Sequence, residues 1–584
     1  MNNKTLKDYI EAQCKLAFAH CFPDLDLKAH PIEITRSTHE RFGHYQCNSA
    51  MKFTKLLKKP PRDIANFVVE HLQKSENVDK YKQLEVAGPG FINITLSDKF
   101  ITDFTQSMLD APSLFNKIAQ PEKVIIDYVG INTAKEMHVG HLRSSIIGDS
   151  LARLFRYLGH NVLGLNHIGD WGTSFGMLIA YLKAYQPDVL TGKVDADLSD
   201  LSRFYKESKK IFDTDPEFKK SAQLEVVRLQ QGDEQGRKAW QIICDISRKG
   251  FEEVAKLLDI DVVERGESFY NPFLADVVKD VEEKGLVTIS DGAKCLFLEG
   301  FVNREGQPLP FMIQKSDGGY NYATTDLAAI RHRFEVEKAD RVLYVIDSGQ
   351  AMHMSMLFEA AKKAHYFDPT KQRVEHVTFG VVLGPDGKKF KTRSGDSEKL
   401  IDLLKAAIDK AKEILLERNH DSKTPMTEAE INTLAEVLGI NAVKYSDLSC
   451  NRLHDYVFSY DRMLRFEGNT AAFLMYSYVR IQGIKRKITN ASLAPLALTH
   501  PAEIDLGIHL AQFPEILISI TDDLMPNRLC DYLYELSEKF NAFFRDCRVE
   551  GVAEQNQRLA LCELTAHVLK EGLHILGLKT VDRM

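Results

Sequence analysis

The fold is decided by the stretch VIIDYVGINTAKEMHVGHLRSSIIGDSLARLFRYLGHNVLGLNHIG, residues 124–169. It opens with an apolar run at 124–129, which is typical of a buried strand, and helical spacing then extends from about residue 138 to 158. Gly159 is a typical helix end, and residues 161–169 predict the next strand. A strand, a helix and a strand in so short a stretch predict a βαβ unit, and therefore a parallel sheet with a right-handed crossover.

The motif His138-Val139-Gly140-His141 lies where this unit passes from strand to helix. Open α/β sheets bind nucleotides at the carboxyl ends of their strands, where helix N-termini present free N–H groups to phosphate. Two histidines three residues apart share one face of the first turn, and the glycine between them leaves room for a ribose or a base. Their ring N–H groups could stabilise the α-phosphate of a nucleotide under attack. The competing interpretation is a helix start with two capping or surface histidines.

A basic loop, GPDGKKFKTRSGDSEK at residues 384–399, follows later in the chain. It comes after a predicted strand at 377–384 and before a helical pattern. Glycines would allow it to close over a triphosphate with the positive side chains of Lys388, Lys389, Lys391 and Arg393. A solvated basic turn is the alternative for the loop alone. Together with the histidine motif, the loop indicates a nucleotide site.

The rest of the chain predicts a multidomain α/β protein. We expect an N-terminal α+β domain at 1–118, a Rossmann-like parallel-sheet domain at 119–455 with a helical insertion at about 175–260, and a C-terminal all-α helical bundle at 456–584. Further strand signals in the middle domain lie at 294–301, 342–347 and 377–384.

Composition excludes several classes of protein. With 75 Lys and Arg residues against 82 Asp and Glu residues, the net charge is -7, unlike a module that is basic throughout to bind nucleic acid. The nine cysteines form no CxxC pair, which argues against a zinc knuckle or a disulfide framework and indicates reduced thiols. The polar start MNNKTLKDYIEAQ and the lack of an apolar run of ~18 residues predict a cytoplasmic protein without a membrane partner.

The histidine motif and the loop sequence KFKTRSG resemble the two signatures of class I aminoacyl-tRNA synthetases. Further stretches resemble the arginyl-tRNA synthetase family, namely AGPGFINITL (87–96), NTAKEMHVGHLRS (132–144), HIGDWGT (167–173), GESFY (266–270), DGGYNYATTD (317–326) and GNTAAFLMYSYVR (468–480). These stretches extend from the first predicted domain to the last, so the resemblance covers nearly the whole chain.

The resemblance implies ATP-dependent activation of L-arginine to arginyl-adenylate, followed by transfer to the 3′ end of tRNA(Arg). It implies that ATP contacts five catalytic residues, which are Lys135, His138, His141, Lys389 and Lys391. It also implies that ATP contacts Gly140 and Arg393. Thr392 stands where the family's loop usually has a second lysine, and Lys135 is expected to replace that lysine. The family often needs bound tRNA before it activates arginine, and Thr392 favours that requirement here.

An arginine substrate needs a planar carboxylate partner, and a buried guanidinium needs more than one. By resemblance, Asp326 and Tyr322 hold the guanidinium, whereas Asp127, Asn132 and Gln350 hold the rest of the amino acid. A surface carboxylate and a strand-end cap are the alternatives for Asp326 and Asp127. Mg²⁺ is expected to arrive with ATP, held mainly by phosphates and water, so we expect no protein-bound metal. The protein is expected to be a monomer.

Two clusters of basic residues are candidates for contact with tRNA phosphates. Residues 51–62 contain five basic residues and no acid, although a solvated helix end would look the same. Residues 441–490 contain eight basic residues against four acids, the basic ones being Lys444, Arg452, Arg462, Arg465, Arg480, Lys485, Arg486 and Lys487. The candidates chosen from both clusters are Lys55, Lys58, Arg465, Arg480, Lys485 and Arg486. By resemblance, the first domain grips the tRNA elbow and the last binds the anticodon.

Other classes of protein remain as alternatives. A non-catalytic RNA-binding paralogue could keep this fold, although the presence of Lys135, His138, His141 and Asp326 argues against it. A nucleotidyltransferase could use the same histidine motif, although such enzymes are shorter and need no helical bundle. Among class I synthetases, the cysteinyl type would need zinc-ligand cysteines, for which this chain has no suitable spacing.

Overall fold

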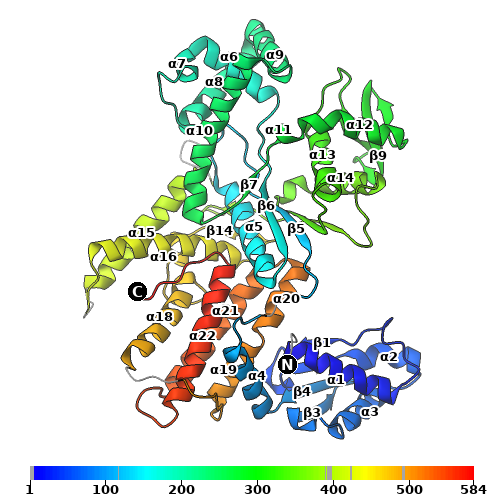
Figure 1. Ribbon diagram of the computed structural model, residues 1–584, viewed down its shortest axis with the longest axis vertical. Helices are drawn as coiled ribbons and strands as arrows, with labels where there is room; N and C mark the ends of the chain where they lie inside the picture. Colours follow the sequence, from blue (N-terminus) through cyan, green and yellow to red (C-terminus); the bar gives the residue numbers. More distant parts are fainter. Residues whose placement is uncertain (1–4, 116, 389, 391–397, 421–423, 489–492) are drawn as a thin grey trace.

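The computed structural model describes residues 5–115, 117–388, 390, 398–420, 424–488 and 493–584 (Figure 1). A parallel sheet lies near the centre of the molecule, and a body of C-terminal helices lies below it in the view of Figure 1. The N-terminal domain lies beside those helices, and a helical insertion forms the opposite end. The predicted multidomain α/β fold is confirmed.

The N-terminal domain combines helices with an antiparallel sheet of order β1-β2-β4-β3. Its elements are α1 (Leu6–Cys21), β1 (Ile34–Arg36), β2 (Tyr45–Cys47), α2 (Ser49–Leu57), α3 (Pro61–Gln73), β3 (Tyr81–Ala87), β4 (Phe91–Leu96) and α4 (Asp98–Asp110). The turn before β4 needs glycine: Gly90 has a φ of +145°, and a side chain there would stand 2.7 Å from the carbonyl oxygen of Pro61.

The central sheet is parallel, with the strand order β12-β11-β5-β6-β7. Its strands are β5 (Lys123–Asp127), β6 (Asn161–Asn166), β7 (Val263–Glu264), β11 (Arg341–Tyr344) and β12 (Arg373–His376). The helix α5 (Val139–Leu158) connects β5 to β6 and ends at Gly159, whose φ is +99°. Successive side chains of β5 enter different cores, Ile125 on one face and Ile126 on the other, as expected of a parallel sheet covered on both sides. The predicted βαβ unit is confirmed.

The predicted helical insertion lies between β6 and β7. It consists of α6 (Thr173–Tyr185), α7 (Pro187–Leu190), α8 (Leu198–Thr214), α9 (Pro216–Gln230) and α10 (Glu234–Leu258). These helices bury an apolar core of their own, which includes Leu178, Phe204 and Ile243. The insertion is therefore a packed unit and not an extended loop.

A second, antiparallel sheet of order β10-β9-β8 follows the insertion. Its strands are β8 (Thr288–Ser290), β9 (Ala293–Val302) and β10 (Pro308–Gln314). The helices around it are α11 (Glu267–Tyr270), α12 (Leu274–Glu283), α13 (Tyr322–Glu335) and α14 (Ala351–Lys363). The predicted strand at 294–301 is confirmed within β9, but it pairs in this sheet and not in the parallel one.

The predicted strand at 377–384 is wrong for most of its length. Only β13 (Val382–Leu383) forms there, paired with β14 (Tyr456–Val457). The backbone N–H of Gly380 donates to the carbonyl of Arg452, 2.9 Å away, in the loop before β14. Because the segment pairs with that loop, it does not extend the central sheet, which ends at β12.

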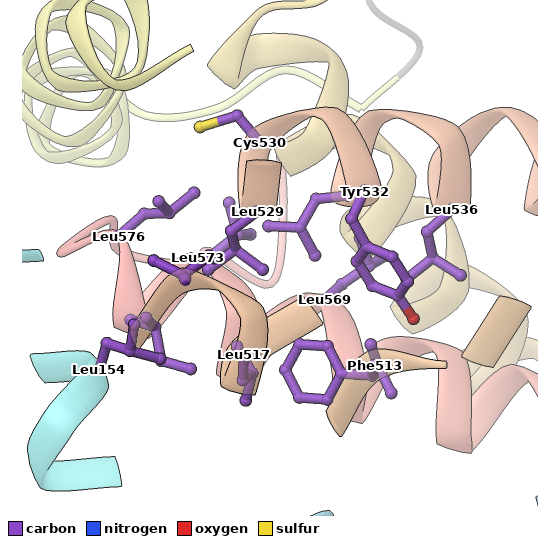
Figure 2. Close-up of a cluster of buried hydrophobic side chains, with 14 of the residues drawn as sticks. Leu154, Phe513, Leu517, Leu529, Cys530, Tyr532, Leu536, Leu569, Leu573 and Leu576 are labelled. Carbon is purple, nitrogen blue, oxygen red and sulfur yellow. The ribbon is translucent and has the colours of Figure 1, made fainter. Parts of the chain in front are cut away.

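The C-terminal part is helical apart from β14 among its described residues. Two helices precede it, α15 (Leu400–His420) and α16 (Glu428–Leu448). Its own helices are α17 (Tyr460–Met463), α18 (Ala471–Lys487), α19 (Pro501–Ala511), α20 (Phe513–Asp523), α21 (Asn527–Asp546) and α22 (Gln555–Ile575). Figure 2 shows Leu154 of α5 beside Leu517 of α20 and Leu573 of α22. The helix that starts at the histidine motif therefore ends against the C-terminal core. Within the described ranges, no helix is both long and apolar enough to cross a membrane.

Candidate active site

The two motif histidines cap the first turn of α5. His138 is the N-cap residue, and its Nδ1 accepts a hydrogen bond from the N–H of Gly140 at 3.0 Å. The N–H of His138 in turn donates to Nδ1 of His141 at 3.1 Å, and the two ring centroids are 4.1 Å apart. A ring nitrogen that accepts a hydrogen bond carries no proton, so each neutral ring holds its proton on Nε2. The cap itself uses neither Nε2–H group, and these are the groups that can donate to a ligand.

Both rings are uncharged at neutral pH. Burial, followed by the charges of His138 and Lys135, lowers the pKa of His141 to about 3. Burial, and then the charge of Lys135, also lowers the pKa of His138. The motif therefore presents neutral N–H donors, and the positive charge beside them belongs to Lys135.

Gly140 allows the cap to form. A side chain at this position would stand 2.7 Å from Cε1 of the His138 ring. The sequence predicted that Gly140 leaves room for a ribose or a base. In the structure, the ring of His138 lies in the space that a side chain at Gly140 would occupy. The backbone of Gly140 still lines the cavity described next.

A cavity of about 600 Å³ opens at the carboxyl ends of β5 and β11, in front of the histidine motif. The predicted residues that line it are Asp127, His138, Gly140, His141 and Asp326. The structure adds lining residues that sequence reasoning missed, among them Arg143, His167, Tyr344 and Asp347. The cavity thus joins the predicted nucleotide residues to the predicted arginine carboxylate.

The loop between β5 and α5 is held in a strained conformation. Val129 and Ala134 have φ values of +77° and +61°, which residues other than glycine rarely adopt. The N–H of Val129 donates to Ser144 Oγ at 2.9 Å, and the N–H of Ala134 donates to Ser247 Oγ at 3.0 Å. Contacts from α5 and from the insertion therefore shape the loop that carries Asn132 and Lys135.

Asn132 and Lys135 are both exposed on this loop. Asn132 pairs with Gly169 in an isolated parallel bridge, and a side chain at Gly169 would stand 2.2 Å from Asn132 Oδ1. The ammonium of Lys135 lies 5.3 Å from the centre of the Tyr205 ring on α8. The insertion thus contacts the residue predicted to replace the missing loop lysine.

Asp326 lies on α13 between two histidines. Its Oδ2 accepts a hydrogen bond from His353 Nε2 at 2.6 Å, and its Oδ1 is 4.0 Å from His167 Nε2. Tyr322 is 63% exposed, and its ring meets the His353 ring at 4.9 Å between centroids. His353 was not predicted from the sequence, because nothing marked it except its position three residues after the candidate Gln350.

Asp127 ends β5 and is held in a buried ion pair. Its Oδ2 accepts a hydrogen bond from Arg333 at 2.7 Å, and the Arg333 side chain is 1% exposed. The strand-end carboxylate therefore has a partner within the protein while it lines the cavity. Gln350 is exposed at the end of a short 3-10 turn, Ser348–Gln350, directly before α14.

Arg143 lies two residues after the motif on α5, where it lines the cavity and is 1% exposed. Its guanidinium is 3.3 Å from the Asp447 carboxylate on α16 and donates to the carbonyl of His454 at 2.8 Å. It therefore connects the cavity to the segment that leads into the C-terminal helices. No sequence signal separated this arginine from a surface residue.

Half of the predicted basic loop lies outside the described residues, including Lys389, Lys391, Thr392 and Arg393. On one side of this gap, Phe390 lines the cavity. On the other, Lys399 pairs with His138 in an antiparallel bridge, and its ammonium lies 2.7 Å from the Glu136 carboxylate. Phe390 and Lys399, on either side of residues 391–397, therefore both lie at the candidate site.

The RNA candidates differ in what surrounds them. Lys55, Lys58 and Arg465 are exposed. The others have protein partners: Arg480 donates to Asn541, Lys485 pairs with Glu563, and Arg486 donates to the carbonyl of Asp582.

The proposed phosphate-binding stripe at 441–490 is wrong for two of its members. Lys444 is fully buried and donates to the carbonyls of Leu258 and Gly577. It thereby joins the C-terminal core to α10. Arg452 is 9% exposed and donates to the carbonyl of Leu524 at 2.9 Å. These two charges satisfy backbone carbonyls and are not available to a phosphate.

The described residues contain no group of three His, Cys, Asp or Glu side chains placed to hold a metal ion.

Three family models match the chain along its length. Residues 105–460 match class I tRNA synthetases (R), catalytic domain, residues 474–584 match the DALR anticodon binding domain, and residues 4–96 match the arginyl tRNA synthetase N terminal domain. A Protochlamydia amoebophila protein named arginine–tRNA ligase is 60% identical, covering 97% of this chain and 98% of its own. A Chlamydia abortus protein of the same name is 49% identical, covering 99% and 100%.

Solved structures agree with these matches. The crystal structure of arginyl-tRNA synthetase from Plasmodium falciparum superposes with a TM-score of 0.85 at 32% identity, covering 100% of both chains. The Thermus thermophilus arginyl-tRNA synthetase superposes with a TM-score of 0.81 at 20% identity, covering 99% of this chain and 100% of its own, which supports the fold alone. The chain belongs to the arginyl-tRNA synthetase family of class I.

Proposed function

We propose that this chain is an arginine–tRNA ligase, which activates arginine with ATP and transfers it to the 3′ end of tRNA(Arg). The observation that carries the proposal is the single cavity that joins the neutral His138–His141 pair to the Asp326 carboxylate. One end presents N–H donors suited to a phosphate, and the other presents an acceptor suited to a guanidinium.

In the first step, the carboxylate of arginine attacks the α-phosphorus of ATP, the bond to the β-phosphate oxygen breaks, and pyrophosphate leaves. The Nε2–H groups of His138 and His141 donate to the α-phosphate oxygens as negative charge builds on them. Lys135 lies beside the pair and supplies positive charge for the β- and γ-phosphates. We assign the same task to Lys389, Lys391 and Arg393 of the basic loop. The protein forms no covalent intermediate, so its contribution is positioning and charge stabilisation.

Arginine is placed with its guanidinium at Asp326, where Tyr322 stands one helical turn earlier. Asp127, Asn132 and Gln350 hold the rest of the amino acid. Because Arg333 fixes the Asp127 carboxylate, that group keeps one orientation at the end of β5. Mg²⁺ enters as the ATP complex, because in nucleotide sites it is held by substrate phosphates and keeps several waters.

In the second step, a hydroxyl of the terminal ribose attacks the adenylate carbonyl, and AMP leaves. The residues proposed to meet tRNA phosphates are Lys55, Lys58, Arg465, Arg480, Lys485 and Arg486. The exposed members can do so directly, whereas Arg480, Lys485 and Arg486 would exchange their protein partners for phosphate. We expect the protein to act as a monomer in the cytoplasm.

The test is ATP–pyrophosphate exchange with each of the twenty amino acids, with and without tRNA(Arg). Exchange with arginine alone supports the proposal, and its dependence on tRNA decides whether the RNA must be seated first. Binding of ATP and tRNA without exchange under both conditions would favour the non-catalytic paralogue. A nucleotidyltransferase would instead release pyrophosphate without any amino acid.

A further inference from the structure

The two oxygens of Asp326 have different surroundings. Oδ2 accepts a hydrogen bond from His353 Nε2 at 2.6 Å. Oδ1 lies on the side of His167, 4.0 Å from its Nε2, and both residues line the cavity. Among the described residues, neither ring nitrogen of His167 has a hydrogen-bond partner. Because buried polar groups are usually hydrogen-bonded, the ring of His167 beside Oδ1 is able to bind a polar group of a ligand or a water.

His353 is itself firmly held. It lies in the first turn of α14, and its side chain is 15% exposed. Its ring stacks on Phe311 of β10 with 5.9 Å between centroids and an angle of 23°. Phe311 is buried in the core beneath, and the Tyr322 ring meets the histidine ring edge-on, with 4.9 Å between centroids. The packing on Phe311 therefore holds the donor nitrogen in place through a residue that has no proposed role in binding arginine.

We infer that His353 is a positioning residue for arginine selection, which holds the Asp326 carboxylate in the single orientation that receives a guanidinium at Oδ1. This inference rests on the proposed role of Asp326 as the guanidinium partner. A free aspartate side chain rotates among several rotamers, and a planar guanidinium binds well only when the carboxylate plane is fixed. A lysine ammonium is a point charge and gains much less from that fixed plane. His353 therefore contributes to the preference for arginine over lysine.

His353→Ala tests the inference through arginine-dependent ATP–pyrophosphate exchange. We expect the KM for arginine to rise about 10- to 100-fold, the loss typical when a group that orients a metal ligand is removed. The KM for ATP and the kcat at saturating arginine should change less than about threefold, since the phosphate end of the cavity is untouched. The ratio of kcat/KM for arginine to that for lysine should also fall, by somewhat less than the loss in arginine affinity, because lysine gains less from the fixed carboxylate.

His353→Gln is the conservative variant, because its side-chain amide can place an N–H near the position of Nε2. It should restore most of the arginine affinity. Met352→Ala, at a neighbouring side chain that is 54% exposed, is the matched control and should behave as the wild type. If the Ala and Gln variants lose arginine affinity, kcat and thermal stability equally, the ring acts by packing on Phe311 and the inference is overturned.

A double-mutant cycle with Asp326→Asn separates this inference from the proposed function. If His353 acts through Asp326, the double variant should lose little more arginine affinity than Asp326→Asn alone. Additive losses would overturn the inference and leave the role of Asp326 intact. An unchanged KM for arginine in Asp326→Asn would instead overturn the proposed guanidinium site itself.

Discussion

The two ends of the cavity hold their polar side chains in different ways. At the phosphate end, His138 and His141 are fixed by hydrogen bonds that span two and three residues of the chain. At the arginine end, Asp326 is held by a histidine 27 residues away, and Asp127 by an arginine 206 residues away. A donor pair that caps its own helix needs only local sequence. A carboxylate that must keep one orientation needs partners from other elements.

This difference has consequences for stability. Loss of a local cap removes one or two hydrogen bonds at a helix end, and water can partly replace these bonds. Loss of a distant partner such as Arg333 leaves a buried charge alone, because no neighbouring residue of β5 can replace it. The arginine end is therefore the more costly part of the cavity to disturb.

The largest effect is expected for Arg333→Leu, which breaks the buried pair with Asp127. The free energy of unfolding should fall by about 3–5 kcal/mol, because the carboxylate stays buried without its partner. Denaturant unfolding measures the loss. The matched control is the double variant Arg333→Leu with Asp127→Asn. It removes the uncompensated charge and should recover part of the lost free energy of unfolding. Equal stability of Arg333→Leu and the wild type would mean that the pair contributes nothing to holding β5.

At the phosphate end, His141→Ala should slow adenylate formation by about 10²–10³-fold, the usual loss for one donor to a developing oxyanion. The fold should remain, with only a cap of about 1 kcal/mol lost. His141→Asn separates the two roles, because its amide oxygen can still accept from the N–H of His138 while the Nε2–H is gone. It should keep the stability and lose the rate. Normal exchange kinetics in His141→Asn would remove His141 from phosphate chemistry.

Asp326→Asn addresses the arginine end without altering the core. We expect arginine binding to weaken by about 2–4 kcal/mol, as for one partner of a hydrogen-bonded charge pair, while ATP binding is unchanged. Exchange kinetics at varied arginine and at varied ATP measure the two affinities separately. A loss of ATP affinity as large as that of arginine would place Asp326 in the nucleotide site.

The smallest effect concerns pH. The pKa of His141 is lowered from 6.5 in the unfolded chain to about 3 in the folded one, so the folded state favours the neutral ring. The contribution of the neutral His141 ring to the free energy of unfolding is complete above pH 6.5, and it is lost progressively as the pH falls toward 3. Between pH 7 and pH 5, the wild type should therefore lose more unfolding free energy than His141→Asn. Parallel losses in the two proteins would mean that this ring is not buried neutral.

Local patterns predicted the elements around the histidine motif well. The strand at 124–129, the helix that ends at Gly159 and the strand from 161 could be predicted because apolar periodicity and a glycine cap lie within the elements themselves. The strand at 377–384 could not be predicted correctly. Its composition suits a strand, but its backbone partners lie near residue 452, and sequence periodicity does not encode which segment pairs with which.

The same limit applies to charged residues. Lys444 and Arg452 look like Lys485 and Arg486 in sequence. The first two are buried against backbone carbonyls, whereas Lys485 is partly exposed and Arg486 is exposed. A charge count along the chain cannot separate them, because burial depends on how the helices meet.

Local patterns in the chain were enough to predict the βαβ core, the helical bundle and the place of the histidine motif at a helix start. These features depend on residues within about one turn or one strand of one another. Three features could be seen only in the folded protein: the partner that orients each carboxylate, the arginines that are buried and the sheet in which each strand pairs. Those outcomes depend on contacts between segments far apart in the chain, and a long-range contact is set by the packing of the whole fold and not by any local pattern.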